Sequence, residues 1–119
     1  MTRKVLICGD RNWSDRGTIR SWLSKLQDLG FDTVIEGEAR GADSIAREEA
    51  EQMGFEVLKF PADWSTYGRA AGPIRNRQML DQSPELVLAF HGNISASRGT
   101  KDTLNEAERR GIETMLVSA

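Results

Sequence analysis

The chain has 119 residues, of which 39% are hydrophobic and 29% are charged, and this composition indicates one globular domain and excludes a disordered or fibrous protein. Its formal net charge of −2 excludes a generally basic surface for non-specific binding of nucleic acid. With one cysteine, Cys8, and one histidine, His91, the chain cannot form an internal disulfide or a cysteine cage for zinc.

Five short apolar runs recur along the chain. They are rich in β-branched and aromatic residues and are bounded by glycine, proline or polar residues, which is typical of strands. Because the runs show almost no polar alternation, we expect them to be covered on both faces, as in a parallel sheet. The runs are residues 4–8, 33–35, 55–60, 86–90 and 114–117.

The segments between these runs have the features of amphipathic helices. In the first segment, apolar side chains recur at spacings of three and four. Asp43 is the expected N-cap of the second, and Pro73 occupies the first turn of the third. The order βαβαβαβαβ predicts an open α/β sheet with right-handed crossovers. The predicted helices span residues 14–29, 43–53, 73–80 and 100–110.

In open α/β sheets, ligands bind beyond the carboxyl ends of the strands, so the residues that follow each predicted strand are the candidates for a site. After the first run, Gly9 allows a sharp turn and close approach of a ligand. Arg11 offers a charge for phosphate, and Trp13 offers a ring for stacking. On these residues alone, a plain turn with a solvated arginine and a packed tryptophan is the simpler interpretation.

The loop after the second run leads into a helix and has the features of a phosphate cradle. Two glycines leave the loop open, an arginine adds a charge, and the helix N-terminus offers free N–H groups. The alternative is an ordinary strand-to-helix turn. The candidate residues are Glu36, Gly37, Arg40, Gly41, Ala42 and Asp43.

The segments after the third and fourth runs add aromatic, basic and small residues. Trp64 offers a stacking ring, and Arg75 and Asn76 fall in the first turn of the third helix, near the binding edge. The alternative is a small satellite core with solvated arginines. A small-residue loop at Arg98, Gly99 and Thr100 then leads into the last helix and suits an anion, unless Thr100 is only a cap.

Two titratable residues are expected to be structural. His91 has no carboxylate at a spacing that indicates a catalytic dyad. Cys8 lies inside a predicted strand, where we expect it to be buried and inert.

Four motifs together resemble the SLOG superfamily, and within it the small stand-alone branch related to the YspA and YpsA proteins of bacteria and phages. The resemblance covers about residues 3–117. It implies a Rossmann-like, three-layer fold with five parallel strands in the order 3-2-1-4-5. It also implies a pocket for a nucleotide or a nucleotide-derived ligand, such as an ADP-ribose-like molecule. The motifs are residues 37–43, 62–64, 68–79 and 97–100.

Members of this superfamily serve as ligand sensors, as DNA-processing proteins, or as hydrolases that release the base from a nucleoside monophosphate. The hydrolases carry a Gly-Gly-x-Gly-Thr-x-x-Glu loop whose glutamate does the chemistry. The corresponding stretch here keeps a Gly-Thr pair, but Thr103 stands where the glutamate is expected and Asp102 is one position short. This departure counts against glycosidic hydrolysis.

We therefore predict one domain over residues 1–119 that binds a nucleotide or nucleotide-derived ligand as a sensor, sequestering or processing domain. Arg40, Arg75 and the helix start at Thr100 are expected to hold phosphates, and Trp13 or Trp64 to flank the base. Two alternatives stay open. One is a phosphoribohydrolase, and the other is a binder of single-stranded nucleic acid that stacks bases on tryptophan. The carboxylates available to a hydrolase are Glu36, Asp43 and Asp102.

We expect the partner to be a small-molecule nucleotide or nucleotide-sugar and not a nucleic acid, because the chain is acidic. We also expect a cytoplasmic homo-oligomer that contacts no membrane, since no apolar stretch approaches the roughly 20 residues that span a bilayer. No cofactor and no metal are expected.

Overall fold

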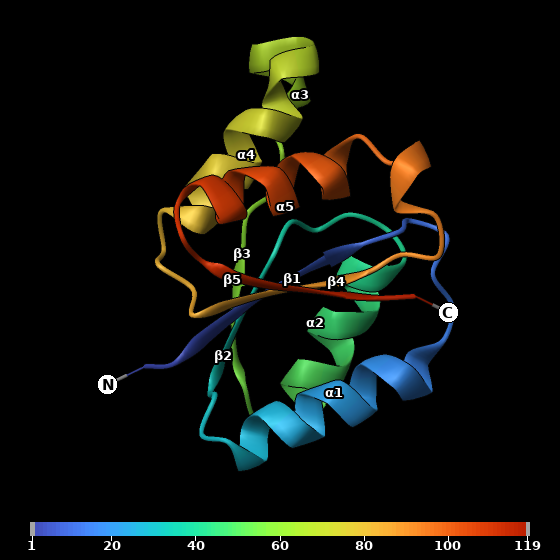
Figure 1. Ribbon diagram of the computed structural model, residues 1–119, viewed down its shortest axis with the longest axis vertical. Coiled ribbons are helices and arrows are strands. Elements are labelled where there is room, and N and C mark those ends of the chain that lie inside the picture. The colour runs from blue at the N-terminus through green and yellow to red at the C-terminus, as the bar shows by residue number, and fades with distance from the viewer. Residues whose placement is uncertain (1, 119) are drawn as a thin grey trace.

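β1, Lys4–Gly9, is the central strand of a five-stranded parallel sheet (Figure 1). The structure is a computed structural model that describes residues 2–118. The strands lie in the order β3-β2-β1-β4-β5, which confirms the predicted α/β Rossmann-like fold class. The remaining strands are β2 Thr33–Glu36, β3 Glu56–Lys59, β4 Leu86–Phe90 and β5 Glu113–Val117.

The helices follow the predicted order, with one short addition. Asp15 caps α1, because its side chain accepts a hydrogen bond from the Thr18 amide at 3.1 Å, so this helix begins after residue 15. The single turn α3 and the 3₁₀ turn η1 fall in the segment after β3, where no helix was predicted. The helices are α1 Arg16–Asp28, α2 Ala42–Gln52, α3 Trp64–Tyr67, α4 Ala71–Leu80 and α5 Gly99–Arg109, with 3₁₀ turns η1 Gly68–Ala70 and η2 Ile94–Ala96.

Each face of the sheet is buried under its own pair of helices. Val5 and Ile7 belong to the core cluster that includes side chains of α1 and α2. Leu6 and Cys8, which alternate with them, belong to the cluster that includes side chains of α4 and α5. Both sets of side chains are therefore removed from water. Burying each large aliphatic side chain stabilises the folded state by about 1.5–3 kcal/mol. This double coverage explains why the central strands β1 and β4 are apolar at nearly every position, whereas the edge strands β3 and β5 have exposed residues.

The order of the sheet reverses at β1. β2 pairs with one edge of β1 and β4 pairs with the other, with Gly9 directly opposite Phe90 at the carboxyl end. The chain leaves β1 toward α1 on one face and leaves β4 toward α5 on the other face (Figure 1). The two connections diverge, and such a divergence is where ligands bind in folds of this kind.

Two glycines are required by close backbone packing at this edge. A Cβ on Gly9 would lie 2.2 Å from the Phe90 carbonyl oxygen, because the two strands end side by side. Gly41 has a φ of +73°, and a Cβ there would lie 2.3 Å from the Asp10 carbonyl oxygen. That carbonyl also accepts a hydrogen bond from the Ala42 amide at 3.1 Å. Gly9 and Gly41 therefore hold the start of α2 against the end of β1.

Asp43 is not the N-cap of α2. The helix begins one residue earlier, with Gly41 at the cap position and no side-chain cap bond. The Asp43 carboxylate instead accepts the amides of Gly37 at 3.0 Å and Ala39 at 3.4 Å, so it fixes the loop before the helix. Within residues 2–118, no helix has the length and apolarity that crossing a bilayer requires.

Candidate functional site

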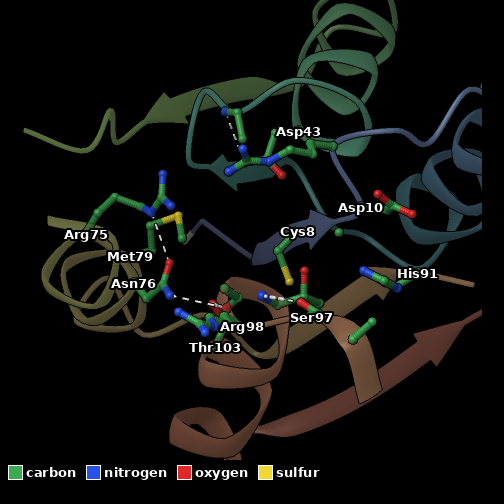
Figure 2. Close-up of a pocket in the computed structure, with 16 residues that line it drawn as sticks. Cys8, Asp10, Asp43, Arg75, Asn76, Met79, His91, Ser97, Arg98 and Thr103 are labelled. Atoms are coloured by element: carbon green, nitrogen blue, oxygen red, sulfur yellow. Dashed lines mark hydrogen bonds between the residues drawn. The ribbon is translucent and has the colours of Figure 1, made fainter. Parts of the chain in front are cut away.

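A cavity of about 330 Å³ opens at the carboxyl edge of the sheet, bordered by the end of β1, by α4 and by the start of α5. We call it the pocket. Figure 2 shows Arg75 and Asn76 on one side of it and Asp10 and His91 on the other. Its volume lies near the lower end of the range for small-ligand sites, which suits one nucleotide-sized group. Eight predicted site residues line it: Gly9, Arg11, Asp43, Arg75, Asn76, Arg98, Gly99 and Thr100.

The pocket contains three arginines in two different states. Arg11 and Arg98 are exposed and make no ion pair within residues 2–118. Arg75 is half-buried, and its Nη1 donates to the Gly37 carbonyl at 2.7 Å. Two guanidinium groups are thus free to bind an anion in the pocket, while the third is held in place by the protein.

Asn76 connects α4 to the start of α5. It is only 3% exposed, and its Nδ2 donates to the Asp102 carboxylate at 3.0 Å and to the Gly99 carbonyl at 3.4 Å. Its Oδ1 accepts a hydrogen bond from Arg75 Nε at 3.0 Å. Asn76 therefore fixes both the guanidinium of Arg75 and the first turn of α5 at the pocket wall.

The first turn of α5 presents backbone N–H groups at the pocket. Ser97 Oγ accepts the Thr100 amide at 3.1 Å, whereas the amide of Gly99, which lines the pocket, has no hydrogen-bond partner within residues 2–118. A Cβ placed on Gly99 would meet no atom within 4 Å, so the space beside this turn is open. Free amides together with the positive end of the helix dipole favour an anion at this position.

Asp43 and Glu36 are buried carboxyl groups with raised pKa values. Burial raises the pKa of Asp43 to about 6, although two backbone amides oppose the shift. Burial raises the pKa of Glu36 to about 7, and the nearby Asp43 adds to the shift. Glu36 Oε1 has no hydrogen-bond partner among the described residues. Asp43 borders the pocket, whereas Glu36 does not line it.

Several predicted site residues lie outside the pocket. Trp13 is 7% exposed and packs on Phe90 with ring centroids 5.5 Å apart, so it is a core residue and cannot flank a base. Trp64 is 56% exposed and lies on α3. The others missing from the pocket lining are Glu36, Gly37, Arg40, Gly41 and Ala42.

The three carboxylates considered for hydrolysis are each held by the protein. Asp102 accepts from Asn76, lies 3.6 Å from Arg77 Nη1 and does not line the pocket. Glu36 is outside the pocket, and Asp43 is held by two backbone amides. This arrangement gives glycosidic hydrolysis little support.

Two residues that follow strands and line the pocket were not among the predicted site residues, and one of them, His91, was expected to be structural. Asp10 and His91 directly follow β1 and β4, so the rule that selected Gly9 also applies to them. His91 Nδ1 accepts the Asn93 amide at 2.9 Å, which leaves Nε2 to carry the proton in the neutral ring. The remaining lining residues that the sequence did not indicate as site residues are Cys8, Ala39, Met79, Ala96, Ser97 and Thr103.

Comparison with known proteins places these features in context. The YspA, cpYpsA-related SLOG family matches residues 3–67. Gene 61 protein of Mycobacterium phage D29 is 38% identical to this chain over an alignment that covers 92% of each protein.

Two solved structures share the fold. DNA processing protein A from Streptococcus pneumoniae superposes with a TM-score of 0.80 and 17% identity, covering 99% of this chain and 51% of that one. DNA processing protein A from Helicobacter pylori gives a TM-score of 0.72 and 16% identity, covering 98% of this chain and 66% of that one. This chain therefore spans between about half and two thirds of these proteins.

The comparison overturns one expectation from the sequence. The Helicobacter pylori structure is described as showing a unique single-stranded DNA binding mode. The expectation of a small-molecule partner and no nucleic acid is therefore wrong. The exclusion of nucleic acid rested on the net charge of the whole chain, which does not report where the charges lie.

Proposed function

The chain belongs to the YspA, cpYpsA-related SLOG family, and we propose that its pocket binds single-stranded nucleic acid by holding one phosphate and its nucleotide. One observation carries the proposal. Two unpaired arginines, Arg11 and Arg98, meet the open first turn of α5 in one pocket at the switch point of the sheet. The fold that presents this pocket is shared with a protein that binds single-stranded DNA.

The chemistry of the pocket suits a phosphate of a nucleic-acid strand. A guanidinium donates two parallel hydrogen bonds to phosphate oxygens, and the amide of Gly99 provides a neutral donor beside it. His91 offers one more donor through Nε2, because its Nδ1 accepts the Asn93 amide. The pocket is therefore rich in donors for an anion, while its small volume limits it to one unit of a polymer.

The negative net charge is compatible with such a site because the charges are segregated. Residues 61–101 contain five basic residues, Arg69, Arg75, Arg77, Arg98 and Lys101, against three acidic ones, Asp63, Asp81 and Glu85. This segment is positive by two charges although the whole chain is negative. The acidic remainder repels a polyanion elsewhere and leaves the pocket edge as the favoured point of contact.

Binding is tested by fluorescence anisotropy with a labelled thymidine oligonucleotide of about 12 nucleotides, a length within the site sizes of single-strand binders. Arg98→Ala and Arg11→Ala are each expected to weaken binding about tenfold or more, because each removes a charged donor. Lys25→Ala on α1 is the matched control, since it removes one exposed charge far from the pocket and should leave the affinity unchanged. Equal affinities for the wild-type chain and both arginine variants would refute the proposal.

A further inference from the structure

The segment of α3 and η1, residues 64–70, stands away from the sheet beyond the start of α4 (Figure 1). None of its residues is buried. Its two aromatic side chains are Trp64, which is 56% exposed, and Tyr67, which is 48% exposed. Because they are three residues apart on a helical turn, they lie on the same side of it. Two large rings are therefore held in water without a role in the core.

The turn and the Trp64 ring are nevertheless held in a defined place. Asp63 caps the turn, since its Oδ1 accepts hydrogen bonds from the Thr66 amide at 3.1 Å and from Ser65 Oγ at 2.9 Å. The Trp64 ring edge lies against Gly72, where an added Cβ would be 3.4 Å from Cη2 of the indole. An aromatic side chain that is already fixed in position loses little conformational freedom when it binds.

The aromatic segment is continuous with the pocket through α4. Gly72, which contacts Trp64, and Arg75, which lines the pocket, are three residues apart on this helix. This separation is about 5 Å along the helix axis. A strand with a phosphate in the pocket therefore has neighbouring bases within reach of the rings.

The charge of the connecting surface also favours a polyanion. Residues 64–80 contain Arg69, Arg75 and Arg77 and no aspartate or glutamate. Of these arginines, only Arg77 is paired within residues 2–118, with Asp102 and Glu106 of α5. Arg69 is exposed and makes no ion pair within the described part of the chain. The segment also lacks the exposed aliphatic side chains that would extend the aromatic pair into a broad apolar surface for a protein partner.

We propose that Trp64 and Tyr67 stack on bases of the strand whose phosphate the pocket holds. The protein would then bind a strand at two adjoining places, the pocket and the two aromatic rings. This inference rests on the proposed function, because the strand is anchored at the pocket. Stacking on an aromatic ring is tolerant of sequence, since every base has a π-face. The two rings, which we call the stacking platform, therefore add affinity for unpaired bases without selecting among them. They disfavour duplexes, whose bases are already stacked.

The test uses two strands of equal length and charge, a labelled thymidine oligonucleotide and its abasic analogue, which keeps the phosphates and lacks the bases. The wild-type chain is expected to bind the thymidine strand about tenfold more tightly than the abasic strand. Trp64→Ala and Tyr67→Ala should each reduce this ratio toward one while leaving the affinity for the abasic strand unchanged. Trp64→Phe should retain most of the ratio, and Arg98→Ala should weaken binding of both strands.

The outcomes separate this inference from the proposed function. Arg98→Ala could weaken binding of both strands while the aromatic variants leave the ratio of affinities unchanged. That result would overturn the proposal of base stacking and would indicate that the exposed rings contact a protein partner instead. If the wild-type chain binds neither strand, the proposed function fails and the platform fails with it. Tyr67→Ala keeps the contact between Trp64 and Gly72, so its effect cannot be ascribed to a collapse of the turn.

Discussion

Glu36 shows how a single residue links burial to the pH dependence of stability. Its carboxyl is fully buried with one unpartnered oxygen, and its pKa of about 7 is above the ordinary value of 4.5. Asp43 is raised in the same direction, to about 6 from 3.8. The folded state therefore holds more protons than the unfolded state between about pH 4 and pH 7. The stabilisation by these groups is complete at the acidic end of this window and is lost as the pH rises through it.

Replacing Glu36 with glutamine should flatten this dependence. The wild-type free energy of unfolding is expected to fall between about pH 5 and pH 8, and the loss should be smaller by about 2 kcal/mol in Glu36→Gln. The glutamine oxygen can still accept the Glu38 amide, which preserves the local turn. Urea titrations of both proteins at the two pH values measure the difference. Parallel losses in the two proteins would show that Glu36 does not titrate in this range.

Gly9 and Gly99 are both pocket glycines, but only one is required for folding. A Cβ on Gly9 would lie 2.2 Å from the Phe90 carbonyl and 2.8 Å from the Ala42 Cβ, whereas one on Gly99 would meet nothing within 4 Å. Gly9→Ala is expected to destabilise the chain by about 2–3 kcal/mol, and Gly99→Ala to leave stability unchanged or slightly raised. Thermal melts of the two variants measure this contrast, and equal midpoints would contradict the packing at the strand ends.

At the scale of elements, the hydrogen bonds that join α4 to α5 control the shape of the pocket. Asn76 is the buried side chain that makes these bonds, and Arg75 depends on it for orientation. Asn76→Ala is expected to reduce stability by about 1–3 kcal/mol and also to weaken oligonucleotide binding. Gln78→Ala, an exposed change on the same helix, is the matched control and should alter neither property. If the Asn76→Ala variant loses stability yet binds the oligonucleotide with wild-type affinity, the hydrogen bonds of Asn76 contribute to folding and not to the binding site.

The sequence predicted the strands and the four long helices because their apolar periodicity is imposed by the two cores. The short α3 escaped prediction, since one turn with no buried residue leaves no periodic pattern. Trp13 and Trp64 both looked like stacking residues. Only packing distinguishes them, because Trp13 is covered by Phe90 whereas Trp64 stands in water. Asp43 was misplaced as a cap because its loop folds back on it, which spacing alone does not reveal.

At the scale of the whole molecule, the topology explains both what was predicted and what was not. The rule that ligands bind beyond the strand ends selected Gly9, Arg98 and Thr100, and all three line the pocket. The net charge led to the wrong prediction that the partner is not a nucleic acid, because the acidic residues are not distributed evenly over the protein. Glu48 and Glu49, for example, are paired with arginines of α1 on the other side of the sheet. A summed charge cannot distinguish such a segregated surface from a uniformly acidic one.

The central claim is that the strand binds at the pocket, and NMR mapping of backbone amides tests it most directly. On titration with an unlabelled thymidine oligonucleotide, the largest shift changes are expected at Asp10, Arg11 and residues 97–101. The amides of α1, residues 16–28, should barely move and so report any non-specific effect. Shift changes confined to α1, or an absence of changes at residues 97–101 while the oligonucleotide binds, would contradict the account.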